Sequence, residues 1–283
     1  MTLSEALTRG TSELEASPWL RADAGRDALF LLLYMAGITR AAYLTDPDRI
    51  LDGAQQAAYD TLIQRRLMHE PIQYITGEQE FYGLALHVTP AVLIPRPETE
   101  HLVEAVLAEL DSQKTLRVLD VGTGSCAIAI ALAHHLPHAQ IVATDISGAT
   151  LKVAAENAVQ HDVAGRIRFA ESDLLQELPP SEALFDAIVS NPPYVPSAER
   201  DDMHPQVREH EPATALFAGA DGLDIYRRLI PQARVALKPG GLLALEIGHG
   251  QRDAVASLLA GWEAVRFVDD LKSIPRVALA RRP

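Results

Sequence analysis

Cysteine and long hydrophobic runs are both scarce in this 283-residue sequence. The single cysteine, Cys126, excludes an internal disulfide and a zinc site built from cysteines, and we predict no metal site. The longest apolar run, residues 28–38, is too short to span a bilayer and predicts a buried helix. The chain does not open with a basic stretch followed by an apolar one, so no signal peptide is predicted. We therefore expect a protein of the cytoplasm that does not contact a membrane. Separately, we expect a monomer.

The sequence also has fewer basic than acidic side chains. The sequence has 25 Lys and Arg against 38 Asp and Glu, a formal net charge of -13. Non-specific binding to nucleic acid depends on neutralisation of phosphates by Lys and Arg, so this balance disfavours DNA or RNA as a partner. We expect no direct contact with nucleic acid.

Three parts follow one another along the chain. In residues 1–75 apolar side chains recur at a three- to four-residue spacing, which predicts a small helical domain. This domain contains no cluster of catalytic side chains, so we expect it to recognise a substrate. Residues 76–96 show short alternating runs around two glycines and predict a β-hairpin connector. Residues 97–283 make up the third and largest part.

Short β-branched runs alternate with helical stretches in this third part. The pattern predicts an α/β fold, Rossmann-like, with a mostly parallel sheet and helices on both faces. The predicted strands are residues 116–122, 140–145, 166–173, 185–191, 240–248, 264–270 and 276–281, and the predicted helices are residues 97–110, 125–136, 148–161, 224–237 and about 250–260.

A glycine-containing turn joins the first of these strands to its helix in "DVGTGSCAIAIALA". Gly122 and Gly124 allow a tight turn, and the helix behind them offers free N–H groups. Asp145 ends the second strand 23 residues after Gly122, where a carboxylate can accept hydrogen bonds from a ribose diol. Gly122, Gly124 and Ala127 also satisfy the dinucleotide spacing, so this turn alone leaves NAD and S-adenosylmethionine both open.

The sequence "SNPPY" after the 185–191 strand separates these two cofactors. The side-chain carbonyl of Asn191 and the backbone carbonyl of Pro192 can accept both hydrogens of a planar –NH₂ group, while Tyr194 packs over its flat face. Such a pair positions an amide nitrogen for attack and stabilises positive charge that develops on it. Hydride transfer has no use for this pair, so S-adenosylmethionine is the predicted cofactor.

These two motifs resemble the class I S-adenosylmethionine-dependent methyltransferases that modify –NH₂ nitrogens. The stretches "EPIQYITGEQEFYGLALHVTPAVLIPRPETE", "EPATALFAGADGLDIYRRL" and "GGLLALEIGHGQ" resemble, more narrowly, the HemK/PrmC family of peptide-chain-release-factor glutamine methyltransferases. The resemblance covers nearly the whole chain. It implies a helical N-terminal domain that helps to hold a release factor, a seven-stranded methyltransferase domain, and the glutamine of the release factor's Gly-Gly-Gln motif as methyl acceptor.

The resemblance also implies roles for individual residues. The methionine part of the cofactor would lie against the loop, the ribose against the acid of the second strand, and the adenine beside the third strand. The substrate glutamine would be held by the "NPPY" residues, of which Asn191 would also border the cofactor. In this order, the residues are Gly122, Thr123, Gly124, Ser125 and Cys126; Asp145; Asp173 and Leu174; and Asn191, Pro192, Pro193 and Tyr194.

Two departures and two alternatives qualify this assignment. Family members commonly have glycine at Cys126 and often an aromatic residue at Leu174. The start of a helix can lower the pKa of a thiol, but the apolar helix after Cys126 favours simple packing.

A ribosomal-protein glutamine methyltransferase would share the chemistry, and an amino-group methyltransferase of nucleic acids would share the core. His134 and His138 could be imagined as metal ligands, although Pro137 between them favours surface histidines at a helix end.

Overall fold

The computed structural model describes residues 1–179 and 184–283 and divides into two compact units. The first unit comprises Met1–Gly77 together with Asp202–Glu211. The second comprises Glu78–Asp201 and Pro212–Pro283. The segment 202–211 therefore belongs to the helical unit, although it lies more than a hundred residues away in sequence.

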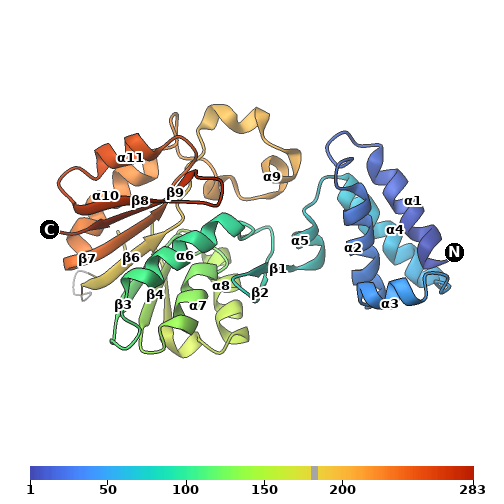
Figure 1. The fold of residues 1–283 in the computed structure, drawn as a ribbon, viewed down its shortest axis with the longest axis horizontal. Helices are drawn as coiled ribbons and strands as arrows, with labels where there is room; N and C mark the ends of the chain where they lie inside the picture. The colour runs from blue at the N-terminus through green and yellow to red at the C-terminus, as the bar shows by residue number, and fades with distance from the viewer. Residues whose placement is uncertain (180–183) are drawn as a thin grey trace. The chain divides into compact units, whose positions relative to one another are not determined.

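The first unit is helical, as the sequence predicts. Two of its helices begin with a capping box, in which the side chains of Thr2 and Glu5, or of Asp52 and Gln55, satisfy each other's backbone N–H groups. The helices are α1 (Leu3–Glu15), α2 (Ala24–Ala36), α3 (Arg40–Thr45), α4 (Gly53–Leu67), α5 (Ile72–Thr76) and, from the distant segment, α9 (Pro205–His210) (Figure 1).

Helices α1, α2 and α4 enclose a core around Tyr59. The Tyr59 hydroxyl is buried and donates to the carbonyl of Ala28 at 3.1 Å. A Cβ on Gly10 would lie 2.3 Å from this hydroxyl, so α1 can approach α4 this closely only with glycine at that position. Gly10 is thus a packing residue rather than a helix breaker.

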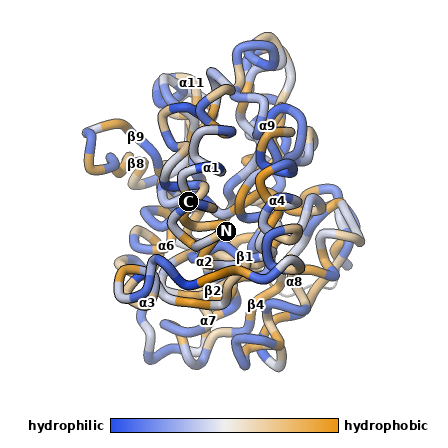
Figure 2. The backbone as a smooth tube through the Cα atoms, turned by 90° about the vertical axis from the view of Figure 1, so that its right-hand side faces the viewer, coloured by the Kyte–Doolittle hydropathy of each residue, from blue (hydrophilic) through white to orange (hydrophobic). Residues whose placement is uncertain are grey.

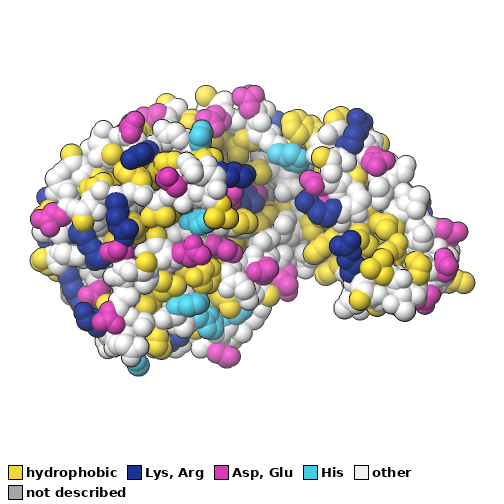
Figure 3. Space-filling view, viewed as in Figure 1, with side chains coloured by type: hydrophobic (Ala, Val, Ile, Leu, Met, Phe, Trp, Pro, Cys, Tyr) yellow, Lys and Arg dark blue, Asp and Glu magenta, His cyan; other side chains and the backbone are white. Residues whose placement is uncertain are grey.

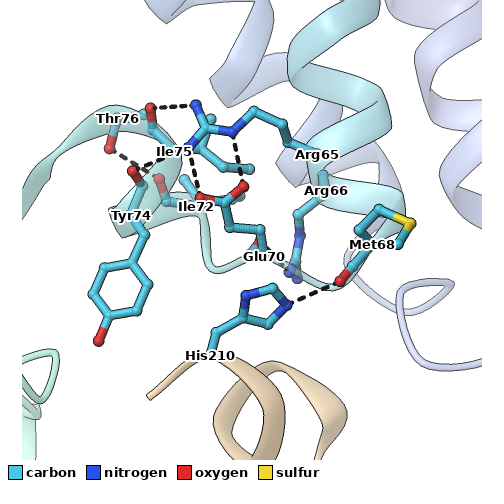
Figure 4. Close-up of polar contacts among 9 residues, drawn as sticks. All are labelled: Arg65, Arg66, Met68, Glu70, Ile72, Tyr74, Ile75, Thr76 and His210. Atoms are coloured by element: carbon cyan, nitrogen blue, oxygen red, sulfur yellow. Dashed lines mark hydrogen bonds and ion pairs between the residues drawn. The ribbon is translucent and has the colours of Figure 1, made fainter. Parts of the chain in front are cut away.

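Charged side chains fix the end of α4 (Figure 4). Arg65 forms a fork with the Glu70 carboxylate, with N···O distances of 2.7 and 2.6 Å. The neighbouring Arg66 is buried and pairs with Asp27 of α2 at 2.9 Å. His210 of the distant segment contacts the carbonyl of Met68 at 2.9 Å. These bonds tie α2, the end of α4 and segment 202–211 together.

The second unit contains a two-stranded hairpin and a seven-stranded sheet. The hairpin pairs β1 (Glu78–Phe81) with β2 (Leu84–His87). The sheet has the order β5-β4-β3-β6-β7-β9-β8, in which β3 to β7 are parallel neighbours and β9 runs antiparallel to β7 and β8. Its strands are β3 (Arg117–Val121), β4 (Gln140–Asp145), β5 (Ile167–Glu171), β6 (Phe185–Ser190), β7 (Leu237–Glu246), β8 (Glu263–Asp269) and β9 (Pro275–Arg281).

Helices cover both faces of this sheet (Figure 1). Alternate residues of each strand point to opposite faces, so Val118 packs with α6 to α8 while Leu119 packs with α10 and α11. The helices are α6 (Pro97–Glu109), α7 (Ala127–His135), α8 (Gly148–Gln160), α10 (Asp224–Ala236) and α11 (Arg252–Leu258), with short 3₁₀ turns at Ala164–Arg166, Ser197–Asp202 and Ala213–Ala215. The α/β, Rossmann-like fold class is confirmed.

Hydrophobic and hydrophilic stretches alternate along the described backbone (Figure 2). Within residues 1–179 and 184–283, no helix is long and apolar enough to cross a membrane. The 28–38 run lies largely in α2, where it supplies core residues.

Candidate active site

The main cavity of the second unit opens at the carboxyl ends of the central parallel strands, where open α/β sheets bind ligands. Its volume is about 500 Å³, which is within the range of cofactor sites. The wall is mostly apolar and includes one carboxylate from the end of β4. The lining includes Gly122, Gly124, Asp145, Asp173, Leu174 and Asn191, all expected from the sequence.

The glycine loop after β3 owes its shape to its backbone. Gly122 and Gly124 have φ angles of 71° and 56°, a left-handed region that side chains disfavour. Both Gly122 and Thr123 donate their N–H groups to the carbonyl of Thr144, at 2.9 and 2.8 Å. A Cβ at either glycine would meet no atom within 4 Å, so conformation and access to the cavity, rather than packing, favour glycine there.

Asp145 lies where the loop and the end of β4 meet. One of its oxygens accepts the N–H of Gly124 and the other that of Ser147, both at 3.1 Å. Burial raises the pKa of this carboxyl, and the backbone N–H groups oppose the shift. A carboxylate has about four acceptor positions, so each oxygen retains capacity for a hydroxyl from the cavity. The residues present therefore fit a ribose-bearing cofactor.

Asp120 was not singled out by the sequence, although it stands beside the loop. Its side chain is fully buried at the end of β3 and accepts a hydrogen bond from the Thr123 hydroxyl at 2.7 Å. Burial raises the pKa of Asp120 to about 7, and the nearby Asp145 charge adds to the rise. Thr123 was expected to contact the cofactor. Its hydroxyl bonds to the buried Asp120 instead, so the Thr123 side chain lies inside the protein and does not line the cavity.

Cys126 also points away from the cavity. It has a φ of 70°, is fully buried and packs in the core formed with α7. Burial raises the pKa of its thiol well above the ordinary value, so the idea of a thiolate at the helix start is wrong. The left-handed φ gives a physical reason why glycine is suited to this position. Ser125 is buried too, and its carbonyl accepts a hydrogen bond from Asn157.

Asp173 and Leu174 border the cavity after β5. The Asp173 carboxylate pairs with Arg228 of α10, which also lines the cavity. Leu174 has a φ of 60° and packs against the α10 side of the sheet. Its backbone conformation, rather than an aromatic ring, shapes this part of the wall.

The "NPPY" residues line the main cavity and a smaller one of about 60 Å³. Asn191 and Pro192 line both cavities, Pro193 lines the larger one, and Tyr194 lines the smaller one. The Asn191 side chain donates from Nδ2 to the Thr99 hydroxyl at 3.0 Å, which leaves Oδ1 as its acceptor. The Tyr194 hydroxyl donates to Glu246 at 3.2 Å. Asn191 and Pro192 thus contact both a cofactor-sized space and a narrow one.

Comparison with known proteins agrees with this geometry. Residues 5–77 match the family model "PrmC N-terminal domain" and residues 99–208 match "Methyltransferase small domain". A release factor glutamine methyltransferase from Koribacter versatilis is 45% identical over 100% of this chain and 99% of its own, and one from Moorella thermoacetica is 44% identical over 94% and 92%. The chain belongs to the release factor glutamine methyltransferase family.

The fold of this family member extends to more distant enzymes. The structure of a T. thermophilus 16S rRNA N2 G1207 methyltransferase in complex with AdoMet and guanosine has a TM-score of 0.55 and 20% identity, over 73% of this chain and 50% of that one. At this identity the likeness concerns the fold alone.

Several residues around the site of this methyltransferase were not predicted from the sequence. Pro90–Leu93, which follow the hairpin, line the main cavity, as do Pro212 and Phe217. Thr99 and Glu246 contact the "NPPY" residues from α6 and β7. The cavity-lining residues Pro90–Leu93, Pro212 and Phe217 lie in stretches that carried the family resemblance. Only the folded chain shows which residues of these stretches reach the cavity.

Of the two histidines considered as metal ligands, His134 packs its ring edge-on against that of His161, and His138 is exposed. Among the residues that the structure describes, no three His, Cys, Asp or Glu side chains form a group suited to a metal ion.

Proposed function

We propose that this chain transfers a methyl group from S-adenosylmethionine to the side-chain amide nitrogen of the glutamine in the Gly-Gly-Gln motif of peptide chain release factors. The observation that carries the proposal is that Asn191 and Pro192 line both the main and the small cavity. The main cavity suits the cofactor and the small one suits an extended amide side chain. Membership of the release factor glutamine methyltransferase family supports the choice of substrate.

The residues of the main cavity would hold the cofactor. Asp145 has acceptor capacity for the ribose hydroxyls, and the Gly122–Gly124 backbone permits close approach of the amino-acid end. Leu174 and Ile146 offer apolar surface for a flat base. When bound, S-adenosylmethionine supplies an electrophilic methyl group on a positively charged sulfur.

The "NPPY" residues would prepare the amide. An amide nitrogen is a poor nucleophile because its lone pair is delocalised. Asn191 Oδ1 and the Pro192 carbonyl would accept hydrogen bonds from its two N–H groups, which orients the lone pair and stabilises the positive charge that develops on nitrogen. The proton is then lost to solvent, so no general base is needed.

Surface charge supports a protein rather than a nucleic-acid substrate. On the face drawn in Figure 3, Lys and Arg side chains are dispersed, with Asp and Glu among them. The formal net charge of -13 agrees with this distribution. Release factor is therefore the substrate that we favour over RNA or DNA.

A competition assay tests the proposal. The enzyme is incubated with methyl-labelled S-adenosylmethionine and, in parallel, with release factor, total ribosomal protein or RNA. We expect label in release factor and none in its Gly-Gly-Gln variant with alanine at the glutamine. Label in ribosomal protein or RNA alone would assign the site to one of the alternatives.

Calorimetry tests the cofactor separately. Wild type should bind S-adenosylmethionine and not NAD, and Asp145→Ala should bind S-adenosylmethionine about tenfold or more weakly.

A further inference from the structure

Glu246, the last residue of β7, is a buried carboxyl group that the proposed chemistry does not use. It is 1% exposed and shares the α6 face of its strand with Leu242 and Ala244. Within the described part of the chain, its Oε2 atom has no hydrogen-bond partner. Burying a carboxyl group with an unsatisfied oxygen is costly, so its presence at the active site calls for a role other than stability.

Thr99, in the first turn of α6, stands between Glu246 and Asn191. Its side chain is 5% exposed and its hydroxyl oxygen accepts the hydrogen bond from Asn191 Nδ2. The same hydroxyl interacts with Glu246 and lowers the pKa of that carboxyl against the effect of burial. A hydroxyl group has one proton. Since the Thr99 oxygen accepts the hydrogen bond from Asn191, its own proton is left to face the Glu246 carboxyl group.

This arrangement determines which way the Asn191 amide faces. An asparagine side chain can turn by 180° and exchange its oxygen and nitrogen. Because the Thr99 oxygen accepts, the nitrogen faces Thr99 and Oδ1 is left for the cavities. With the opposite orientation, an NH₂ group would face the substrate amide and repel its hydrogens.

The same carboxyl group also reaches the other end of the "NPPY" segment. Glu246 Oε1 accepts the hydrogen bond of the Tyr194 hydroxyl, and its backbone carbonyl accepts that of Tyr226 at 2.8 Å. Gln251 in turn donates to the backbone carbonyl of Tyr194 at 2.9 Å. Glu246 is thus connected to both residues that flank the two prolines.

We propose that Glu246 is a positioning residue, which fixes the orientation of the Asn191 amide through Thr99 and anchors Tyr194 directly. The proposal deepens the proposed function and rests on it for the identity of the substrate amide. The orientation of Asn191 itself does not depend on that identity.

Selective labelling of asparagine tests the orientation without any assay of activity. The sequence contains only two asparagines, Asn157 and Asn191, so a ¹⁵N-asparagine spectrum shows two side-chain amides. Asn157 is buried and bonded to His87 and Ser125, which makes it an internal control. Thr99→Val and Glu246→Gln should each shift the Asn191 NH₂ signals and speed their hydrogen exchange about tenfold, while Asn157 stays unchanged. Thr99→Ser should restore the wild-type signals.

Either of two results in this spectrum would overturn the proposal. Unchanged Asn191 signals in both variants would show that the network does not hold the amide. Equal changes at both asparagines would assign Thr99 and Glu246 a general structural role. Thr115→Val, an exposed threonine of the same unit, serves as control and should leave both signals in place.

Kinetics provide the second readout. Thr99→Val should lower kcat about tenfold with little change in the affinity for S-adenosylmethionine, because only the orientation of Asn191 is lost. In an Asn191→Ala background the same change should alter kcat by less than about twofold. Equal losses in both backgrounds would contradict the proposal. If wild type methylated no release factor, the proposed function would fail, and the amide spectrum would still decide the role of Glu246.

Discussion

The two polar atoms of the Asn191 side chain have different partners. Its nitrogen is engaged by Thr99, so its oxygen is available to the substrate. We expect Asn191→Ala to lower kcat about a hundredfold, a loss of about 3 kcal/mol, because a hydrogen bond that strengthens in the transition state is removed. Calorimetry should find the affinity for S-adenosylmethionine within about threefold of wild type. Turnover near that of wild type would contradict the role of Asn191 in positioning the amide.

The buried carboxyl of Glu246 makes stability depend on pH. Burial raises its pKa from 4.5 to about 7, against the Thr99 and Tyr194 hydroxyls and the charge of Arg276, while the Glu98 charge adds to the rise. Between these two values the folded chain binds more protons at this group than the unfolded chain does. The contribution of Glu246 to the free energy of unfolding therefore falls as pH rises through this window, and the full cost is present above pH 7.

Glu246→Gln removes this titration. We expect the variant to be about 3 kcal/mol more stable than wild type at pH 8, because above a pKa of about 7 the wild-type carboxyl is buried as an anion, with a smaller difference at pH 5. Urea unfolding of both proteins at the two pH values measures this. The same variant should lose activity, so stability and turnover should change in opposite directions. An equal stability difference at pH 5 and pH 8 would show that Glu246 does not titrate as described.

At the scale of elements, Asn157 connects three parts of the catalytic unit. From α8 it exchanges two hydrogen bonds with the backbone of His87 in β2 and donates a third to the carbonyl of Ser125 in the glycine loop. We expect Asn157→Ala to lower the free energy of unfolding by about 3 kcal/mol, because buried backbone groups lose their partners, and to weaken cofactor binding. Glu156→Ala, its exposed neighbour, should change stability by less than about 0.5 kcal/mol. A similar effect of both variants in urea unfolding would contradict this account.

The elements themselves were largely predictable from the sequence. Short apolar runs, often β-branched, mark the strands, and all seven strands of the sheet were predicted, from Arg117–Val121 to Pro275–Arg281. The strand order was not predictable from these runs, because the placement of β9 between β7 and β8 depends on contacts between distant residues. The packing of segment 202–211 with the helical unit is non-local in the same way.

The residues of the site also differ in how far they could be predicted, and the reason is again whether the signal is local in sequence. Gly122, Gly124, Asp145 and Asn191 could be found because each sits at a strand end in a recognisable local pattern. Thr99 and Glu246 could not, since they reach the site from a helix and a strand far away in sequence. Cys126 carried a local cue, the helix start, but burial outweighed it and raised the pKa of the thiol. Local rules predict the backbone frame, and burial decides the chemistry of the side chains.

At the scale of the whole molecule, the helical unit and the catalytic unit should be separable in function. Every residue that lines the main cavity belongs to the second unit. We expect deletion of residues 1–77 to leave the affinity for S-adenosylmethionine within about threefold, because the cofactor contacts remain. Methylation of intact release factor should fall about tenfold or more, while a short Gly-Gly-Gln peptide should be methylated as before. Circular dichroism checks the fold of the deletion variant, and equal activity on the intact factor would remove the recognition role.

The central claim is that Asn191 and Pro192 present a glutamine amide for methylation. Tandem mass spectrometry of release factor after incubation with the enzyme and S-adenosylmethionine tests it most directly. The account predicts a single methyl group on the side-chain nitrogen of the Gly-Gly-Gln glutamine, which forms about a hundredfold more slowly when Asn191→Ala replaces the wild-type enzyme. A methyl group on any other residue, or an unmodified glutamine beside a methylated ribosomal protein or RNA, would contradict it.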